Sequence, residues 1–415
     1  MSTRSLAIAA IVFSLFSCGG AATSKQQPSP REPEPAENAT AQKEIAMEMN
    51  AFSLELFRAL RQGNDPGTNT LASPYSVDTA LAMVYAGAKG QTADEMREVL
   101  HYDASTSEFH RVMGNLGRSL ESSEEYQLNV ANALWPHVRY TLLDSYVDLM
   151  REAYETDVTR LDYENNVELA RQTINDWVEE KTEDRIEDLI PEGVLDSMTR
   201  LVLTNAIYFK GLWLSQFKED DTSKAPFTLL DGSTTKVQMM KQRNDFHYFA
   251  NDWLQAVDLP YTGERVAMTI LLPKDAADLT RLESELTSQW LESTLTEMTE
   301  QEIDLSLPRF TMNAKSSLSD VLQGMGMITA FSENADFSGM SGVPDLLISE
   351  VIHQAFIEVN EEGTEAAAAT GVVMKLTAAP MDIPAFVADH PFVFLLRDTK
   401  TACILFTGVL AKPEE

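Results

Sequence analysis

The residue types that most often carry catalysis are present in this chain but are not spaced for it. Six histidines are scattered, and no pair has the spacing of zinc ligands: His101, His110, His137, His247, His353 and His390. Gly339-Met340-Ser341-Gly342 is close to the G-x-S-x-G turn of a hydrolase nucleophile, but Val343 stands in place of the last glycine. There is no P-loop and no Gly-x-Gly-x-x-Gly or Cys-x-x-Cys motif. The sequence therefore predicts a protein that is not an enzyme and that needs no metal and no cofactor.

Residues 361–380 give two conflicting structural signals. Thr364 could cap a helix that four alanines extend and Gly371 closes. The same residues also alternate with period two, as in a strand with one buried face. One side holds Thr364, Ala366, Ala368, Thr370, Val372, Met374 and Leu376, and the other holds Glu365, Ala367, Ala369, Gly371, Val373 and Lys375. On this segment alone, a solvated loop with a helical turn and a partly buried strand both stay open.

Composition narrows the class of partner. The chain has 415 residues, of which 44% are hydrophobic, and 32 Lys and Arg stand against 64 Asp and Glu, a net charge of -32. Phosphate backbones need clustered cations, so nucleic acid is excluded as the expected partner and basic protein surfaces are favoured. Cys403 lies in an apolar run that predicts a buried strand, and Cys18 is the only other cysteine, so no intramolecular disulfide is expected.

The first 43 residues predict export. Arg4 followed by the apolar run 6–16 predicts a signal peptide over residues 1–17, because the run is too short to span a bilayer. Leu15-Phe16-Ser17-Cys18-Gly19 resembles a bacterial lipobox, which implies lipidation of Cys18; an ordinary signal peptide cut near Ala22 is the alternative. Residues 18–43, rich in proline and glutamate, predict an extended linker. The expected location is extracellular or in the cell envelope, as a membrane-anchored lipoprotein of the outer membrane in a Gram-negative cell.

Residues 44–413 predict one continuous α+β domain. Apolar residues from Ile45 to Leu60 recur at helical spacing, Ser73-Pro74 begins a second helix, and Thr92-Ala93-Asp94-Glu95 is a capping box for a third. Further helical faces lie near 142–150 and 170–178, and a hairpin turn is expected at 231–232. Strands are predicted near 201–209, 266–272, 303–307, 351–359, 392–396 and 403–410. Helices and strands do not alternate regularly, which excludes a doubly wound sheet.

Four blocks of this domain resemble the serpin family, in the family's order. Glu361-Glu362-Gly363-Thr364-Glu365-Ala366-Ala367-Ala368-Ala369 resembles the hinge of inhibitory serpins, and residues 386–396, Phe-Val-Ala-Asp-His-Pro-Phe-Val-Phe-Leu-Leu, are similar to the C-terminal signature. Residues 204–213, Thr-Asn-Ala-Ile-Tyr-Phe-Lys-Gly-Leu-Trp, resemble the central strand motif. Residues 73–76 and 86–92, Ser-Pro-Tyr-Ser and Ala-Gly-Ala-Lys-Gly-Gln-Thr, resemble the second helix and the turn after it. The resemblance implies helices packed around three β-sheets with an exposed reactive-centre loop.

The resemblance also implies an inhibitor of serine-type endopeptidases that acts as a suicide substrate. The target protease cleaves the loop, becomes acylated, and is trapped covalently when the freed hinge inserts into the central sheet. The expected partner is this protease, bound by a monomer. The hinge residues implied are Glu361, Gly363, Thr364, Ala366, Ala367, Ala368 and Ala369, and the residues around the parting strands are Ser73, Ser76, Asn205, Trp213 and His353. Gly363 is expected to give backbone freedom where the loop enters the sheet.

The target follows from the cleaved bond, which the family's spacing places at Thr377-Ala378, within a window from Leu376 to Met381. A small residue there suits elastase-like proteases, whereas Leu376 suits chymotrypsin-like ones, and Lys375 is early for a trypsin-like target. Gln354 departs from the Lys or Arg of many members, which bears on the polar network next to His353. The alternatives are a non-inhibitory serpin, acting as a carrier, chaperone or interaction protein, and an inhibitor of papain-like cysteine proteases.

Overall fold

The computed structural model describes residues 36–62, 65–103, 106–156, 158–364 and 383–413. The chain divides into Met1–Pro35 and Ala36–Glu415, and the described residues all belong to the second unit. Its first helix begins at Ala36, so residues 36–43, predicted as linker, are helical and Gln42 is buried. These residues include three alanines, a glutamate, a glutamine and a lysine, all good helix formers, and they extend the helix that the apolar spacing predicts from Ile45.

The described residues include ten α-helices. They are α1 (Ala36–Gln62), α2 (Pro74–Tyr85), α3 (Gly90–Leu100), α4 (Ser107–Leu120), α5 (Asp144–Tyr154), α6 (Val167–Lys181), α7 (Leu279–Glu285), α8 (Ser288–Glu297), α9 (Ser319–Met325) and α10 (Ser338–Ser341). Ser73 caps α2 and Pro74 follows it, as predicted. The capping box at Thr92 is wrong: α3 begins at Gly90, and the Thr92 hydroxyl instead accepts a hydrogen bond from the backbone N–H of Asp336.

The described strands form two hydrogen-bonded sheets. They are β1 (Thr70–Ala72), β2 (Tyr126–Pro136), β3 (Leu201–Leu212), β4 (Ser223–Thr228), β5 (Thr234–Ala250), β6 (Leu254–Pro260), β7 (Val266–Pro273), β8 (Thr299–Pro308), β9 (Phe310–Ser317), β10 (Glu350–Val359), β11 (Gly363–Thr364), β12 (Ala385–Val387), β13 (Phe392–Asp398) and β14 (Ile404–Leu410). The larger sheet has the order β1-β14-β13-β7-β6-β5-β8-β12, with β4 on β5, and the smaller has the order β2-β3-β11-β10-β9. The long strand β5 pairs with β4, β6 and β8, and so connects two of the three expected sheets into one network.

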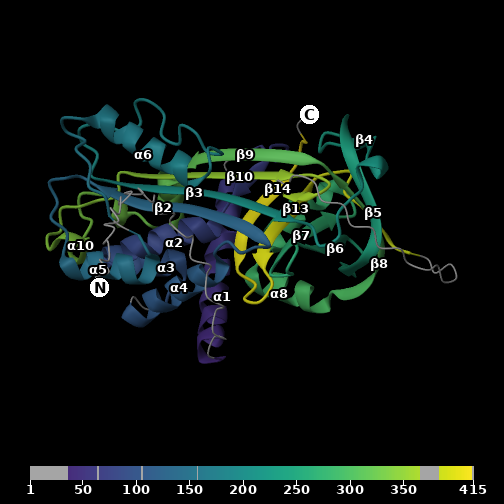
Figure 1. The fold of residues 1–415 in the computed structure, drawn as a ribbon, viewed down its shortest axis with the longest axis horizontal. Coiled ribbons are helices and arrows are strands. Elements are labelled where there is room, and N and C mark those ends of the chain that lie inside the picture. The colour runs from purple at the N-terminus through teal and green to yellow at the C-terminus, as the bar shows by residue number, and fades with distance from the viewer. Residues whose placement is uncertain (1–35, 63–64, 104–105, 157, 365–382, 414–415) are drawn as a thin grey trace, which may run out of the picture. The chain divides into compact units, whose positions relative to one another are not determined.

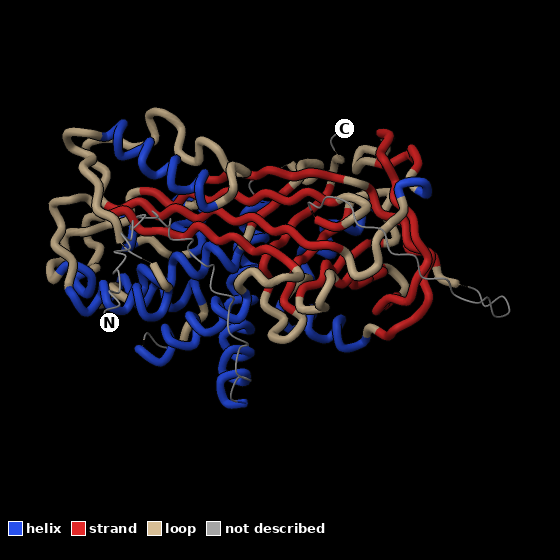
Figure 2. The backbone as a smooth tube through the Cα atoms, viewed as in Figure 1, coloured by secondary structure: helices blue, strands red, loops and turns tan. Residues whose placement is uncertain are grey.

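The five-stranded sheet lies between two layers of helix (Figures 1 and 2). Alternate residues of β3 face opposite sides: Leu203 and Ile207 belong to the main core with α2, whereas Val202 and Ala206 pack with α6. The strands predicted from apolar runs are confirmed, and the α+β class with them. Strands β1, β2, β6, β9 and β12 were missed. No helix among the described residues is long and apolar enough to cross a membrane.

Candidate functional site

Strands β3 and β10 of the smaller sheet pair directly with each other at one end of their length and are separated by another strand at the other end. The two strands pair in parallel from Val202–Glu350 to Tyr208–Phe356, and we call this segment the closed end. Beyond it the chain turns back after β10, and β11 lies between the two strands, antiparallel to both. Thr364 is opposite Gly211 of β3 and Val359 of β10, and we call this segment the open end. The start of the predicted hinge is therefore already a strand inside the sheet.

At the open end there is no room for a side chain at position 363, so a glycine is required there. A Cβ atom added to it would lie 2.0 Å from the carbonyl oxygen of Gly211 and 2.8 Å from the Cα atom of Leu212. Both of these atoms belong to the backbone of β3, so neither can move aside cheaply. The glycine was predicted for its conformational freedom, but the structure gives the close approach to β3 as the reason.

The Thr364 side chain is buried and contacts Tyr261. Its exposed fraction is 0%, and its hydroxyl shares a hydrogen bond of 2.7 Å with that of Tyr261. Trp213 stacks on Tyr261 with ring centroids 4.3 Å apart, and its indole N–H donates to the carbonyl of Asn360 at 3.0 Å. Trp213, predicted among the residues around the parting strands, lies at the open end. A charged side chain in place of Thr364 would be buried where the described side-chain partner is the neutral hydroxyl of Tyr261.

Glu361 anchors the turn that leads into β11. Its side chain is 4% exposed, and both carboxylate oxygens accept hydrogen bonds of 2.6 Å from Arg309, which is 47% exposed. The hydroxyl of Thr222 donates a further hydrogen bond of 2.7 Å. Burial alone would raise the pKa of Glu361, but the bonds from Arg309 and Thr222 outweigh it and hold the pKa below its usual value. The carboxylate is therefore ionised and held in place.

At the closed end, a buried polar cluster around His353 joins β3 to β10 on the face of the sheet that packs against α2. The backbone N–H of Ser73 donates to His353 Nε2 at 3.0 Å, so Nδ1 carries the proton and donates to Asn205 Oδ1. Burial lowers the pKa of His353 to about 4, which keeps the ring neutral at pH 7. The Ser73 hydroxyl in turn donates to the carbonyl of Leu405 at 2.6 Å. One imidazole thus connects β10, β3 and the start of α2.

Ser76 and Asn132 complete this cluster. The side-chain amide of Asn205 donates to Ser76 Oγ and to Asn132 Oδ1, both at 2.6 Å. The Ser76 hydroxyl donates to Asn132 Oδ1 at 2.8 Å, and the Asn132 amide donates to the carbonyl of Ser76 at 2.9 Å. The structure therefore brings the four predicted residues, Ser73, Ser76, Asn205 and His353, into one network. It adds Asn132, which sequence reasoning missed with the strand β2 that carries it.

Gln354 lies on the opposite face of the sheet from His353, because side chains alternate along β10. Its amide donates to Asn313 Oδ1 on β9 at 2.7 Å, and its buried Oε1 atom has no partner among the described residues. The departure from Lys or Arg at this position therefore leaves the His353 cluster intact. Its effect falls on the other face of the sheet.

Tyr261, Arg309 and Thr222 were also missed, because each lies far along the chain from the hinge it contacts. The predicted residues Ala366, Ala367, Ala368, Ala369, Thr377, Ala378 and Cys18 lie outside the described residues. Among the described residues, no group of three or more His, Cys, Asp or Glu side chains could hold a metal ion. What the described residues define is a sheet in which the short strand β11 lies between β3 and β10 at one end, above a buried polar cluster at the other.

Comparison with known proteins identifies the family in which such a sheet occurs. A family described as serpin (serine protease inhibitor) matches residues 47–413. An uncharacterized serpin-like protein of Thermococcus kodakarensis is 41% identical over 381 residues, covering 90% of this chain and 87% of that protein. The leukocyte elastase inhibitor of Bos taurus is 40% identical over 373 residues, covering 87% and 97%. The chain belongs to the serpin family.

Solved structures agree on the fold. Uncleaved ovalbumin has a TM-score of 0.80 at 30% identity, covering 89% of this chain and all of that one. Human thyroxine-binding globulin, solved with its hormone, has a TM-score of 0.82 at 28% identity, covering 90% of this chain and all of that one. The predicted serpin fold is confirmed, and serpins are protease inhibitors rather than enzymes as a family.

Proposed function

We propose that this chain inhibits serine proteases by trapping them covalently after they cleave the loop between β11 and β12. The observation that carries this proposal is β11 itself, which lies between β3 and β10 with Thr364 buried. A strand that continues from Thr364 toward the closed end would place Ala366 and Ala368 on the same face. These side chains are small and uncharged, so they fit between strands that are already packed.

The stored free energy needed for trapping would come from pairing this strand. Insertion would join the hydrogen-bonding edges of β3 and β10 to a central strand and bury apolar side chains from the loop. The protease, still attached as an acyl-enzyme, would be carried along the sheet before water could release it. The cleaved bond is proposed at Thr377-Ala378, within the window from Leu376 to Met381, which suits elastase-like or chymotrypsin-like targets.

The test is formation of an SDS-resistant complex with pancreatic elastase and with chymotrypsin. Wild-type protein is expected to form it, and Thr364→Arg to be cleaved without forming it, because the guanidinium would be buried beside Tyr261 without a partner. Thr364→Ser keeps the hydroxyl and is the matched control, expected to inhibit. Cleavage without complex by the wild type would favour a non-inhibitory serpin, and a complex with papain alone would favour cysteine proteases.

We also propose that Cys18 carries the lipid of an envelope lipoprotein, on the strength of the lipobox-like residues 15–19. Two or more acyl chains would anchor the protein stably, and the proline-rich segment before α1 would hold the inhibitor away from the lipid surface. Cys18→Ala should block processing or release a soluble form. Mass spectrometry of the mature N-terminus decides this, since an unmodified terminus downstream of Cys18 means simple secretion.

A further inference from the structure

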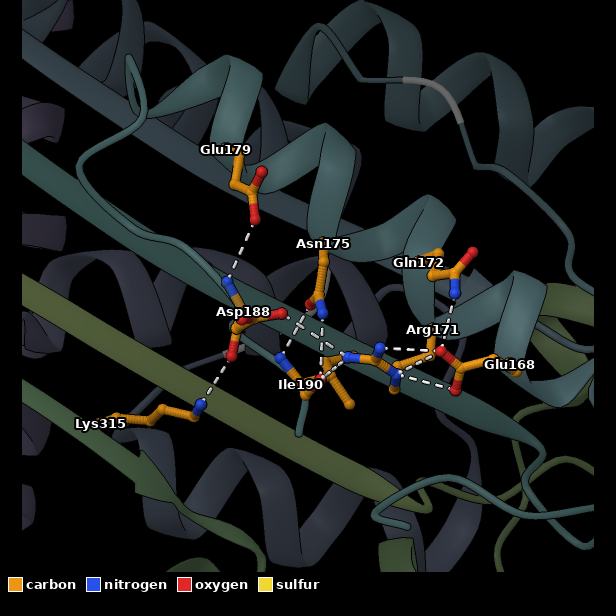
Figure 3. Close-up of polar contacts among 8 residues, drawn as sticks. All are labelled: Glu168, Arg171, Gln172, Asn175, Glu179, Asp188, Ile190 and Lys315. Carbon is orange, nitrogen blue, oxygen red and sulfur yellow. Dashed lines mark hydrogen bonds and ion pairs between the residues drawn. The ribbon is translucent and has the colours of Figure 1, made fainter. Parts of the chain in front are cut away.

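The outer face of the five-stranded sheet is crossed by a segment that the family motifs do not include. Residues 182–200 connect α6 to β3, and we call them the strap. Figure 3 shows the polar contacts that tie the strap to α6 on one side and to Lys315 of β9 on the other. Between α6 and β9 the strap passes the line along which β3 and β10 must part.

The strap is fixed to α6 by the side chains of Asn175, Arg171 and Glu179. Asn175 donates to the carbonyl of Ile190 at 3.0 Å and accepts from the backbone N–H of Ile190 at 2.8 Å. Arg171 donates to the same carbonyl at 2.7 Å and is held by Glu168. Four apolar side chains of the strap, Ile186, Leu189, Ile190 and Leu195, belong to the cluster between α6 and the sheet. Its other members include Ala131 and Ala133 of β2, Val202 and Ala206 of β3, and Ile352 of β10. Most of this cluster lies on the β2 and β3 side of the parting line.

Across the line, the strap is held by the ammonium group of Lys315. This group donates to the carbonyl oxygen of Asp188 at 2.7 Å (Figure 3). Lys315 is the residue of β9 directly opposite Gln354 of β10, so the bond starts from the far side of β10. Partial burial lowers the pKa of the Lys315 ammonium, and the Asp188 carboxylate partly offsets this.

Asp188 is also strained. Its φ angle is 48°, and Glu183 and Asp184 in the same strap have φ angles of 52° and 58°. Residues other than glycine rarely adopt such positive φ angles. Both polar groups of its backbone are engaged, since its N–H donates to Glu179 Oε1 at 3.2 Å and its carbonyl accepts from Lys315. Strained backbone persists where surrounding contacts hold it in place.

We propose that the Lys315–Asp188 hydrogen bond is a latch whose breaking helps to set the rate at which a strand inserts between β3 and β10. Insertion moves β10 and β9 away from β3 by one strand spacing, about 4.8 Å. A bond of 2.7 Å across that line cannot survive while the strap stays with α6 and β3. Lys315 is thus a positioning residue that holds the strap over the closed sheet. This inference rests on the proposed function, because it concerns the same insertion step.

Lys315→Met removes the donor and keeps most of the side-chain stem. It is expected to speed insertion about threefold to fivefold, the size expected from losing one charge-assisted hydrogen bond that is partly exposed. Two readouts follow this step: the rate at which an acetylated peptide of residues 364–376 is incorporated as the added strand, and the ratio of covalent complex to cleaved product with elastase. Lys315→Arg keeps a donor and should restore wild-type values. Lys236→Met, an exposed lysine of β5, is the matched control.

The outcomes separate the two proposals. If no variant forms a complex or takes up the peptide, the proposed function fails and the latch with it. If the wild type does both and Lys315→Met does so at the same rate, or Lys236→Met changes the rate equally, the latch alone is overturned. A lower thermal midpoint for Lys315→Met with unchanged rate and ratio would mean a purely structural role, and would also overturn it.

Discussion

The closed end and the open end of the β3–β10 line are built from different interactions. The closed end is a buried, neutral network in which His353 connects β10 to β3 and to the start of α2, and Asn205 connects β3 to α2 and β2. The open end contains an ion pair with one exposed partner, Arg309, and a hydroxyl pair between Thr364 and Tyr261. A partly exposed ion pair is weak, whereas buried polar groups are costly to leave unpaired. The comparison teaches that β11 already separates β3 from β10 at the end with the weaker, partly exposed contacts. Under the proposed function, further opening would have to separate the buried polar groups of the closed end.

Inserting a strand at the closed end is expected to change the stability of the protein more than any other change considered. Cleavage between Thr370 and Met381, with a protease that is not trapped, should raise the thermal midpoint by tens of degrees. The freed segment would pair with both β3 and β10 and bury apolar area. Differential scanning calorimetry of intact and nicked protein measures this. An unchanged midpoint would mean that the closed end does not accept the strand.

Removing the centre of the closed-end network should cost the intact protein about 2–3 kcal/mol of unfolding free energy. Asn205→Leu leaves the Nδ1–H of His353 and the Oδ1 atom of Asn132 without their shared partner. Asn334→Leu changes an exposed asparagine and serves as the control, with little expected effect. Urea unfolding of the two variants compares them, and equal losses would show that the network does not hold the strands.

Acidification should weaken the closed end through His353. Its pKa is about 4 in the folded protein, whereas a histidine in the unfolded chain has the ordinary pKa of 6.5. Between pH 4 and 6.5 the unfolded chain therefore binds more protons than the folded protein does. The free energy of unfolding therefore falls as pH drops from 6.5 to 4, by up to about 3 kcal/mol. Asp78, whose pKa burial raises to about 8, acts in the opposite sense. The difference between wild type and His353→Gln in thermal midpoint across this range isolates the histidine, and parallel curves would contradict the assignment.

Breaking the ion pair at the open end should have the smallest effect, about 1 kcal/mol, because Arg309 is half exposed. Arg309→Met leaves the buried Glu361 carboxylate with Thr222 as its described side-chain partner. Glu361→Gln in the same chain removes the charge and should recover part of the loss. A double-mutant cycle measures the coupling by chemical unfolding at pH 7. A loss as large as that of Asn205→Leu would remove the distinction between the two ends.

The sequence predicted the hinge and the family motifs well because these signals are local. The small residues after Gly363, the Ser73-Pro74 helix start and the apolar run of β3 each follow from neighbouring residues. Strand β2 was missed because its side chains do not alternate cleanly: Asn132 points into the polar cluster between buried alanines. Strand β9 was missed because one of its faces is polar, where Lys315 and Asn313 contact the strap and Gln354.

The sequence alone determined the family, the α+β class and the residue types of the hinge. The hydrophobic period, the turn residues and the small side chains that indicate them each depend on residues close together in the sequence. Tertiary structure alone decided that Thr364 meets Tyr261, that Glu361 meets Arg309, and that Lys315 reaches Asp188. These pairs are 103, 52 and 127 residues apart. Their meeting depends on the register of paired strands and on the path of the strap, and both are set by the packing of the whole core rather than by local preference.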